Sequence, residues 1–163
     1  MKTIFILFTQ YKVWFARFLS IIRHHNYSHV ALALDDDRNC FYSFNIKGFC
    51  CETPEKYKRH GVTKSILYEV KVKDESYNKI REKIYETAEN RNRMKYSFWG
   101  IALCLLRIPF HKKNQYFCSE FVADLLKKSK TIMLRKRSSL YLPEHLRMEL
   151  EHHLGIRKLV NVV

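Results

Sequence analysis

The fold is decided by residues 27–45, which read YSHVALALDDDRNCFYSFN. Residues 28–34 read as a strand, because larger and small apolar side chains alternate over residues 30–34, a pattern typical of a buried strand. Three consecutive aspartates at residues 35–37 predict a turn. Residues 40–45 are rich in aromatic side chains, as expected of a strand that returns beside the first. We therefore predict an antiparallel hairpin.

His29 interrupts this otherwise apolar strand. Because side chains alternate along a strand, His29 shares one face with Ala31 and Ala33. These small side chains leave space for a packed helix or a substrate cleft, and the larger aliphatic residues face the other way. A histidine in a strand is more often structural, so His29 alone does not establish a site.

Other elements are predicted on both sides of the hairpin. Residues 3–8 read as a buried strand, and the apolar residues between Val13 and Ile22 predict a helix capped by Thr9. Periodicity and breaker residues further predict a strand over 66–72, helices over 76–92, 98–106 and from Cys118 onward, a helix start at 142–144 and a last strand over 158–163. Strands before and after a helical stretch indicate an α+β class, with a small antiparallel sheet packed against helices.

The composition fits a single domain over residues 1–163. A hydrophobic fraction of 47% allows one sizeable core, and no repeat or linker-like stretch divides the chain. The apolar start lacks a cleavage site for export, and residues 98–110 are too short to span a bilayer. Five cysteines form no framework of the secreted type. We therefore expect a cytoplasmic protein whose thiols are all reduced.

The formal net charge of +14 favours anionic partners. The basic clusters are scattered and no nucleic-acid motif accompanies them, so a generally basic surface is the simpler interpretation and no specific nucleic acid is expected. The aromatic and aliphatic residues 96–110, flanked by basic ones, are compatible with an interfacial helix on an anionic lipid surface, although such segments are more often core. The oligomeric state stays open.

Cys118 is the candidate nucleophile. It lies at the predicted start of a helix, where free amides and the positive end of the helix dipole stabilise a thiolate. A thiolate there can attack a carbonyl, and its own amide can help to hold the oxyanion. Its spacing from Phe121 and Val122 also fits a small core residue, the commoner role of a free cysteine. The presence of His29 as a base favours the chemical role.

A third group that orients His29 is expected on the returning strand. If the hairpin pairs simply, Ser43 lies nearest, with Asn45 and Tyr42 as alternatives. None of these is a carboxylate, so the imidazolium would be stabilised less than in an acid-backed triad.

A metal site is the weaker interpretation of the same residue types. Cys50-Cys51 with His60, or His24-His25 with His29, lack the paired spacing of a zinc site. Adjacent side chains on a strand also point apart. We expect no metal and no cofactor.

These motifs resemble those of a known group of enzymes. The chain resembles circularly permuted NlpC-type papain-like hydrolases in the order of three motifs. These are residues 27–32 (YSHVAL), a polar residue on the next strand, and residues 117–122 (FCSEFV). That group includes the YiiX-like proteins and, more distantly, the lecithin–retinol acyltransferase-like enzymes. Residues 142–146 (LPEHL) are also similar. The resemblance implies a permuted papain-like fold with Cys118 as nucleophile and His29 as base.

The same resemblance implies further site residues and a function. Residues 95–100 (KYSFWG) are similar to the family segment whose tyrosine assists the oxyanion, which implies this role for Tyr96. Ser43 departs from the family, whose members usually carry His or Glu at that place. The expected function is cleavage of an amide, peptide-like bond through a Cys118 acyl intermediate. The alternatives are acyl transfer or thioester hydrolysis on a lipid amide or ester, and a non-catalytic module that binds an anionic partner.

Overall fold

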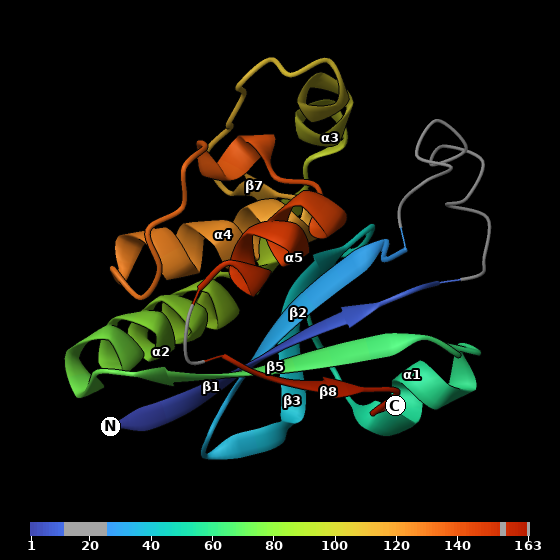
Figure 1. Cartoon of the computed structure of the whole chain (residues 1–163). Helices are drawn as coiled ribbons and strands as arrows, with labels where there is room; N and C mark the ends of the chain where they lie inside the picture. The colour runs from blue at the N-terminus through green and yellow to red at the C-terminus, as the bar shows by residue number, and fades with distance from the viewer. Residues whose placement is uncertain (12–25, 154–155, 163) are drawn as a thin grey trace.

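The computed structural model describes residues 1–11, 26–153 and 156–162. Within them the chain forms a six-stranded antiparallel sheet with helices packed on it, which confirms the predicted α+β class (Figure 1). In their order across the sheet, the strands are β4 (Gly48–Glu52), β3 (Asp37–Asn45), β2 (His29–Leu34), β1 (Lys2–Thr9), β5 (Ser65–Val72) and β8 (Arg157–Val160).

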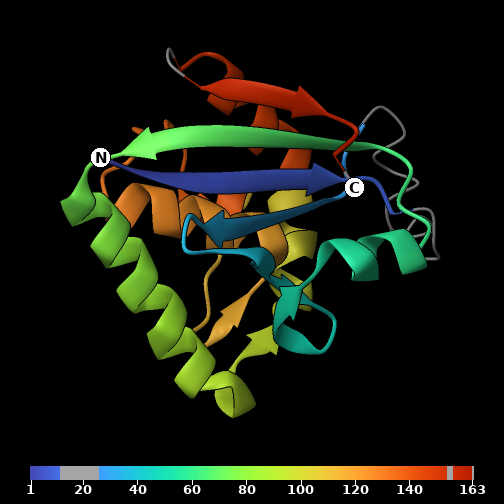
Figure 2. The same ribbon diagram turned by 90° about the horizontal axis from the view of Figure 1, so that it is seen from below.

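The helices lie mostly on one side of this sheet. They are α1 (Pro54–Arg59), α2 (Asp74–Glu89), α3 (Phe98–Leu105), α4 (Cys118–Lys128) and α5 (Pro143–Glu151), with 3₁₀ turns at Arg91–Arg93 and Ser138–Leu140. A short parallel pair, β6 (Lys95–Tyr96) and β7 (Gln115–Tyr116), forms a second sheet, and β6 contacts β3 and β4 of the main sheet. Seen from below, β8, β5, β1 and β2 lie side by side with α4 behind them (Figure 2).

The hairpin predicted over residues 28–45 is confirmed. β2 and β3 pair antiparallel, with Leu32 opposite Tyr42, and a register shift follows before the turn. The strands predicted over 3–8 and 66–72 correspond to β1 and β5. The helix expected between Val13 and Ile22 lies outside the described residues.

The alternation predicted for β2 separates two cores. Val30 and Leu32 belong to the main core, which is built between the sheet and α2, α4 and α5. Ala31 and Ala33 belong to a smaller cluster on the opposite face, together with Tyr57 of α1. The space left by the two alanines is thus used by a helix, one of the two options that the sequence left open.

Two elements between β3 and β5 are not predicted from the sequence, namely β4 and α1. Their local signals are nevertheless present. Gly48, at the start of β4, has φ of +103°, and a Cβ there would collide with the carbonyl oxygen of Met94. Thr53 caps α1 by accepting a hydrogen bond from the amide of Lys56 at 3.3 Å, and Pro54 stands at the first helical position.

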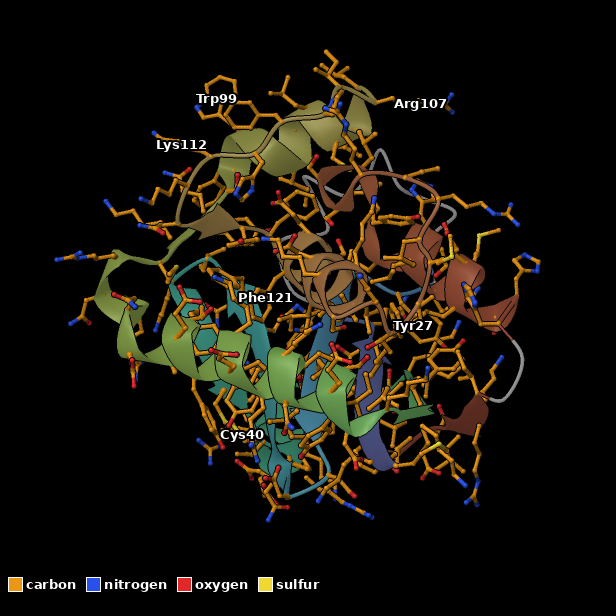
Figure 3. All side chains as sticks on the ribbon, turned by 90° about the vertical axis from the view of Figure 1, so that its left-hand side faces the viewer. Tyr27, Cys40, Trp99, Arg107, Lys112 and Phe121 are labelled. Carbon is orange, nitrogen blue, oxygen red and sulfur yellow. A yellow bond between two sulfur atoms is a disulfide. The ribbon has the colours of Figure 1, made fainter. Side chains whose placement is uncertain are left out.

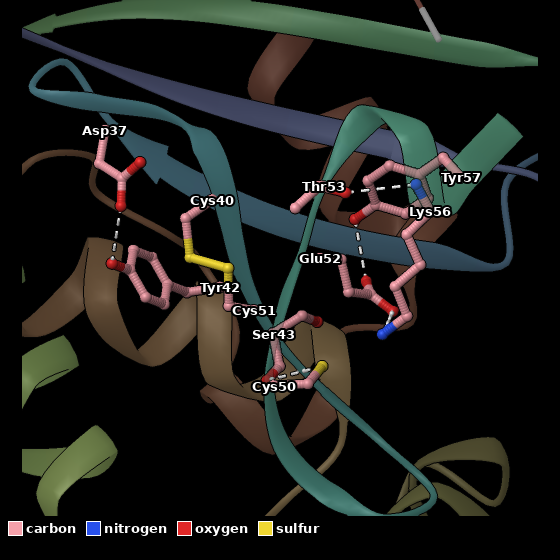
Figure 4. The surroundings of a disulfide bond; sticks show 10 residues. All are labelled: Asp37, Cys40, Tyr42, Ser43, Cys50, Cys51, Glu52, Thr53, Lys56 and Tyr57. Carbon is pink, nitrogen blue, oxygen red and sulfur yellow. Dashed lines mark hydrogen bonds and ion pairs between the residues drawn. A yellow bond between two sulfur atoms is a disulfide. The ribbon is translucent and has the colours of Figure 1, made fainter. Parts of the chain in front are cut away.

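A disulfide joins Cys40 on β3 to Cys51 on β4 (Figure 4). The two Cα atoms are 5.3 Å apart, within the usual range for a bridged pair, because β3 and β4 are neighbouring strands. The expectation that all five thiols are reduced is therefore wrong for this pair. Cys50, Cys104 and Cys118 are free.

Among the described residues, no helix combines the length and the apolar character needed to cross a lipid bilayer.

We expect Leu32→Ala to lower the free energy of unfolding by about 2–5 kcal/mol, because Leu32 is fully buried at the centre of the main core and the truncation leaves a cavity. Urea denaturation measures the change. Met133→Ala, at a side chain that is 89% exposed, is the control and should change stability by less than about 0.5 kcal/mol. Equal effects of the two substitutions would contradict the assigned core.

Candidate active site

One cleft of about 370 Å³ is lined by three of the side chains singled out from the sequence. His29 reaches it from the first position of β2, Cys118 from the first position of α4, and Tyr96 from the end of β6. Further residues of its wall and rim are Tyr11, Ser28, Phe44, Asn45, Ile46, Lys47, Glu52, Lys56 and His60. The cleft therefore joins the end of the sheet to the start of the helix that covers it.

The imidazole of His29 is held by a carboxylate. Its Nε2 lies 2.7 Å from Oε2 of Glu52, and the two residues are only 8% and 3% exposed. Burial alone would lower the pKa of His29, but the charge of Glu52 and hydrogen bonds with Cys118 and Glu52 outweigh it and raise that pKa above its ordinary value. His29 is thus held as an imidazolium beside an ionised partner.

Glu52 is supported by three groups besides His29. The hydroxyl of Tyr57 donates to Oε2 at 2.9 Å, and the hydroxyl of Tyr11 donates to Oε1 at 3.4 Å. Lys56 Nζ lies 3.9 Å from Oε1 (Figure 4). Burial would raise the pKa of Glu52, but the charge of His29, the hydrogen bonds with His29 and Tyr57 and the charge of Lys56 lower it to about 2. The carboxylate is therefore ionised at neutral pH.

The thiol of Cys118 is hydrogen-bonded to the imidazole of His29. Since Nε2 faces Glu52, Nδ1 is the ring nitrogen left for the sulfur. The ring of Tyr11 packs edge-on against the imidazole, with centroids 5.4 Å apart, and so limits its rotation. The carboxylate of Glu52, the imidazole of His29 and the thiol of Cys118 consequently form a continuous hydrogen-bonded chain.

Tyr96 is brought to Cys118 by the short β6–β7 pair. Tyr96 stands opposite Tyr116, and the amide of Ser97 donates to the carbonyl oxygen of Tyr116 at 3.0 Å. Only Phe117 separates Tyr116 from Cys118 in the chain. Burial, together with the nearby Cys118, raises the pKa of Tyr96 well above its ordinary value. Its hydroxyl therefore stays protonated and able to donate.

Gly100 allows this segment to pack closely. Ser97 caps α3 by accepting a hydrogen bond from the amide of Gly100 at 3.2 Å. A Cβ on Gly100 would collide with Oγ of Ser97 and press on the ring of Phe117. The glycine of the KYSFWG segment is thus explained by the close approach of α3 to the residue before Cys118.

Ser43 does not orient His29, contrary to the expectation from the sequence. Its hydroxyl donates to the carbonyl oxygen of Val30 at 2.7 Å and serves as a tie between β3 and β2. Of the two alternatives, Tyr42 donates to Asp37 at 3.3 Å, whereas Asn45 lines the cleft. The group that contacts the imidazole is Glu52, from the next strand outward.

Glu52, Tyr57 and Tyr11 are functional candidates that the sequence argument missed. The sequence does mark the helix start at Thr53-Pro54, directly after Glu52, but nothing in that pattern links Glu52 to His29. Tyr57 follows on that same helix, whose first turn it shares with Lys56.

Metal ligation receives no geometric support in the described part of the chain, where no three His, Cys, Asp or Glu side chains converge as ligands. Of the sets weighed from the sequence, Cys51 is bonded to Cys40, and His24 and His25 lie outside the described residues.

The chain was compared with protein-family models, with curated proteins and with solved structures, and nothing matches in any of the three comparisons.

The ion pair predicts a pH-dependent stability. The pKa of His29 is raised from 6.5 and that of Glu52 is lowered from 4.5 to about 2. The stabilisation is therefore complete between about pH 4.5 and 6.5. It is lost as the pH rises through the raised pKa of His29, and also as the pH falls towards the lowered pKa of Glu52.

We expect Glu52→Gln to lower the free energy of unfolding by about 2–3 kcal/mol near pH 6, and by less towards pH 9. Urea denaturation of both proteins across this range measures the difference. Glu75→Gln, which breaks an exposed pair with Lys79, is the control and should leave the midpoint unchanged at every pH. A difference between Glu52→Gln and wild type that does not vary with pH would contradict the charged pair.

Proposed function

We propose that this protein is a cysteine hydrolase that cleaves an amide bond through an acyl intermediate on Cys118. One observation carries the proposal: the imidazole of His29 is hydrogen-bonded on one side to the thiol of Cys118 and on the other to the carboxylate of Glu52. A nucleophile, a base and a group that orients the base are the parts that covalent acyl chemistry requires.

In the proposed reaction, the thiolate of Cys118 attacks the carbonyl carbon of the substrate. The carbon–nitrogen bond breaks as the imidazolium of His29 gives its proton to the departing amine, which leaves a thioester on Cys118. Water then attacks the thioester while His29 takes a proton from it. The carbon–sulfur bond breaks, the acid leaves, and the thiolate of Cys118 and the imidazolium of His29 are restored.

We assign two donors to the negative oxygen that forms during each attack. The amide of Cys118 is in the first turn of α4, where backbone amides have no partner within the helix and the N-cap residue offers no side-chain bond. The hydroxyl of Tyr96 lines the same cleft and stays protonated. Both groups are fixed before substrate binds, because backbone hydrogen bonds join the β6 and β7 segments and only Phe117 separates β7 from α4.

Glu52 also bears on the choice between catalysis and simple binding. A non-catalytic module would be favoured if no acidic residue oriented His29, but Glu52 supplies one. Glu is also one of the two residue types, His or Glu, that members of the resembled permuted papain-like family usually carry as the third residue. The order His29 before Cys118 agrees with that family, and we propose a permuted papain-like fold on this basis. Acyl transfer would use the same thioester and replace water by another acceptor.

The first test is the rate at which iodoacetamide labels Cys118 as a function of pH, followed by mass spectrometry. An ordinary thiol, with a pKa near 8.5, reacts little at pH 6. We expect Cys118 to be labelled at pH 6 because the imidazolium of His29 stabilises its thiolate, and His29→Ala to slow labelling at least about tenfold. Cys104, whose pKa burial raises to about 12, is an internal control that should stay unlabelled.

The assignment of the third group is tested in the same assay. Glu52→Gln should slow labelling at pH 6, since the imidazole loses the charge that keeps it protonated. Ser43→Ala should leave the rate unchanged, because its hydroxyl contacts only a backbone carbonyl. Labelling of Cys118 that follows an ordinary thiol profile in wild type and in His29→Ala would reject the proposed pair.

The second test is direct detection of the intermediate. Incubation with p-nitrophenyl acetate should give an acetyl adduct on Cys118 by intact-mass and peptide-mass spectrometry. We expect Cys118→Ala to abolish the adduct and to lower nitrophenol release at least about 10³-fold. Adducts distributed over lysines, with no dependence on Cys118, would contradict the proposal.

A further inference from the structure

Helix α3 is apolar on all sides, yet one of its faces is exposed. Its eight residues read FWGIALCL. Ile101 and Cys104 are buried in the main core at 4% and 5% exposure. Trp99 and Leu106, spaced to share the opposite face together with Leu103, are 74% and 68% exposed. A helix that is apolar all round normally has both faces covered, so this arrangement indicates a partner for the outer face.

The exposed apolar surface extends beyond the helix itself. Phe98 at its start is 57% exposed, and Ile108 just after its end is 48% exposed. Four of the eleven large hydrophobic side chains that are exposed in the described part of the chain thus fall within residues 98–108. Scattered exposed residues need no explanation, but a cluster of this kind does.

The same region is uniformly cationic. Between Asn90 and Ser119 the sequence has no Asp or Glu. It has six cationic side chains, namely Arg91, Arg93, Lys95, Arg107, Lys112 and Lys113. Figure 3 shows Trp99, Arg107 and Lys112 projecting from the same end of the molecule, around α3. Apolar and basic side chains are therefore presented together, with no acidic residue of this segment among them.

We propose that α3 and the loop that follows it, residues 98–113, dock on an anionic lipid bilayer. Trp99 and Leu106 would enter the interfacial layer, and Arg107, Lys112 and Lys113 would contact negatively charged headgroups. A second copy of the chain fits less well, because pairing this face with itself would bring two sets of like charges together. A nucleic acid would use the basic residues but leave the apolar side chains of α3 in water.

Docking through this face would bring the cleft close to the membrane surface. The ring of Phe98 packs edge-on against Tyr96, with centroids 4.9 Å apart, and Tyr96 lines the cleft with Cys118. Ile46, which is 45% exposed, is another apolar residue on the cleft wall. The proposal does not depend on catalysis, so Cys118→Ala should bind vesicles as the wild type does.

The test uses vesicles made of phosphatidylcholine alone or of an equal mixture with phosphatidylserine. The chain has two tryptophans, Trp14 and Trp99, so Trp14→Phe makes the emission report Trp99 alone. With the mixed vesicles we expect co-sedimentation and a blue shift of Trp99 emission, as the indole leaves water. Both should be much weaker with phosphatidylcholine alone, and added salt should weaken binding to the mixed vesicles.

Matched substitutions separate the apolar from the ionic contribution. Leu106→Gln should weaken binding about tenfold, and Lys112→Gln and Lys113→Gln about fivefold each. The controls are Met133→Gln, at an apolar side chain that is 89% exposed beyond the far end of α4, and Lys71→Gln on β5. Both controls should bind as the wild type does, and circular dichroism checks that every variant is folded.

Three results would overturn the proposal. The first is equal binding to both kinds of vesicle. The second is binding to RNA or heparin, but not to mixed vesicles, without a shift of Trp99 emission, which would identify a soluble polyanion as the partner. The third is a dimer in sedimentation analysis that Leu106→Gln dissociates, which would identify a second copy of the chain as the cover of α3.

Discussion

The buried ion pair between His29 and Glu52 is the constraint on which the rest of the structure depends. Two charges removed from water are costly unless each is fully hydrogen-bonded. Tyr11 and Tyr57 supply the additional donors, from the chain after β1 and from α1. The small cluster on the outer face of the sheet therefore does more than cover apolar surface, because it holds Tyr57 in place against the carboxylate.

The thiol of Cys118 is positioned by the layer of helices that covers the sheet. α4 lies on the inner face of the sheet and anchors itself through side chains such as Phe121 and Val122, both in the main core. His29 can contact both layers because it stands at the first position of β2, where the sheet ends. The contact between the sulfur of Cys118 and the imidazole of His29 therefore depends on how α4 packs against the sheet. Core substitutions under α4 are expected to affect reactivity as well as stability.

Much of the fold and part of the candidate site can be predicted from the sequence. The hairpin follows from the alternation over residues 30–34, and the patterns around His29 and Cys118 point to two residues that do line one cleft. Glu52 is missed because β4 is only five residues long and contains two adjacent cysteines, so it carries no periodic signal. Ser43 is misassigned because simple pairing ignores the register shift in the hairpin and the carbonyl that uses its hydroxyl.

The order of the elements along the chain has a consequence for biosynthesis. β2 and β4, which carry His29 and Glu52, leave the ribosome long before α4, which carries Cys118. His29 and Glu52 can therefore associate in a nascent chain that still lacks Cys118. The thiol of Cys118 meets the imidazole only when the helical layer closes on the sheet. A chain that stalls before α4 would lack the proposed nucleophile, so the proposed pair forms only when the fold is nearly complete.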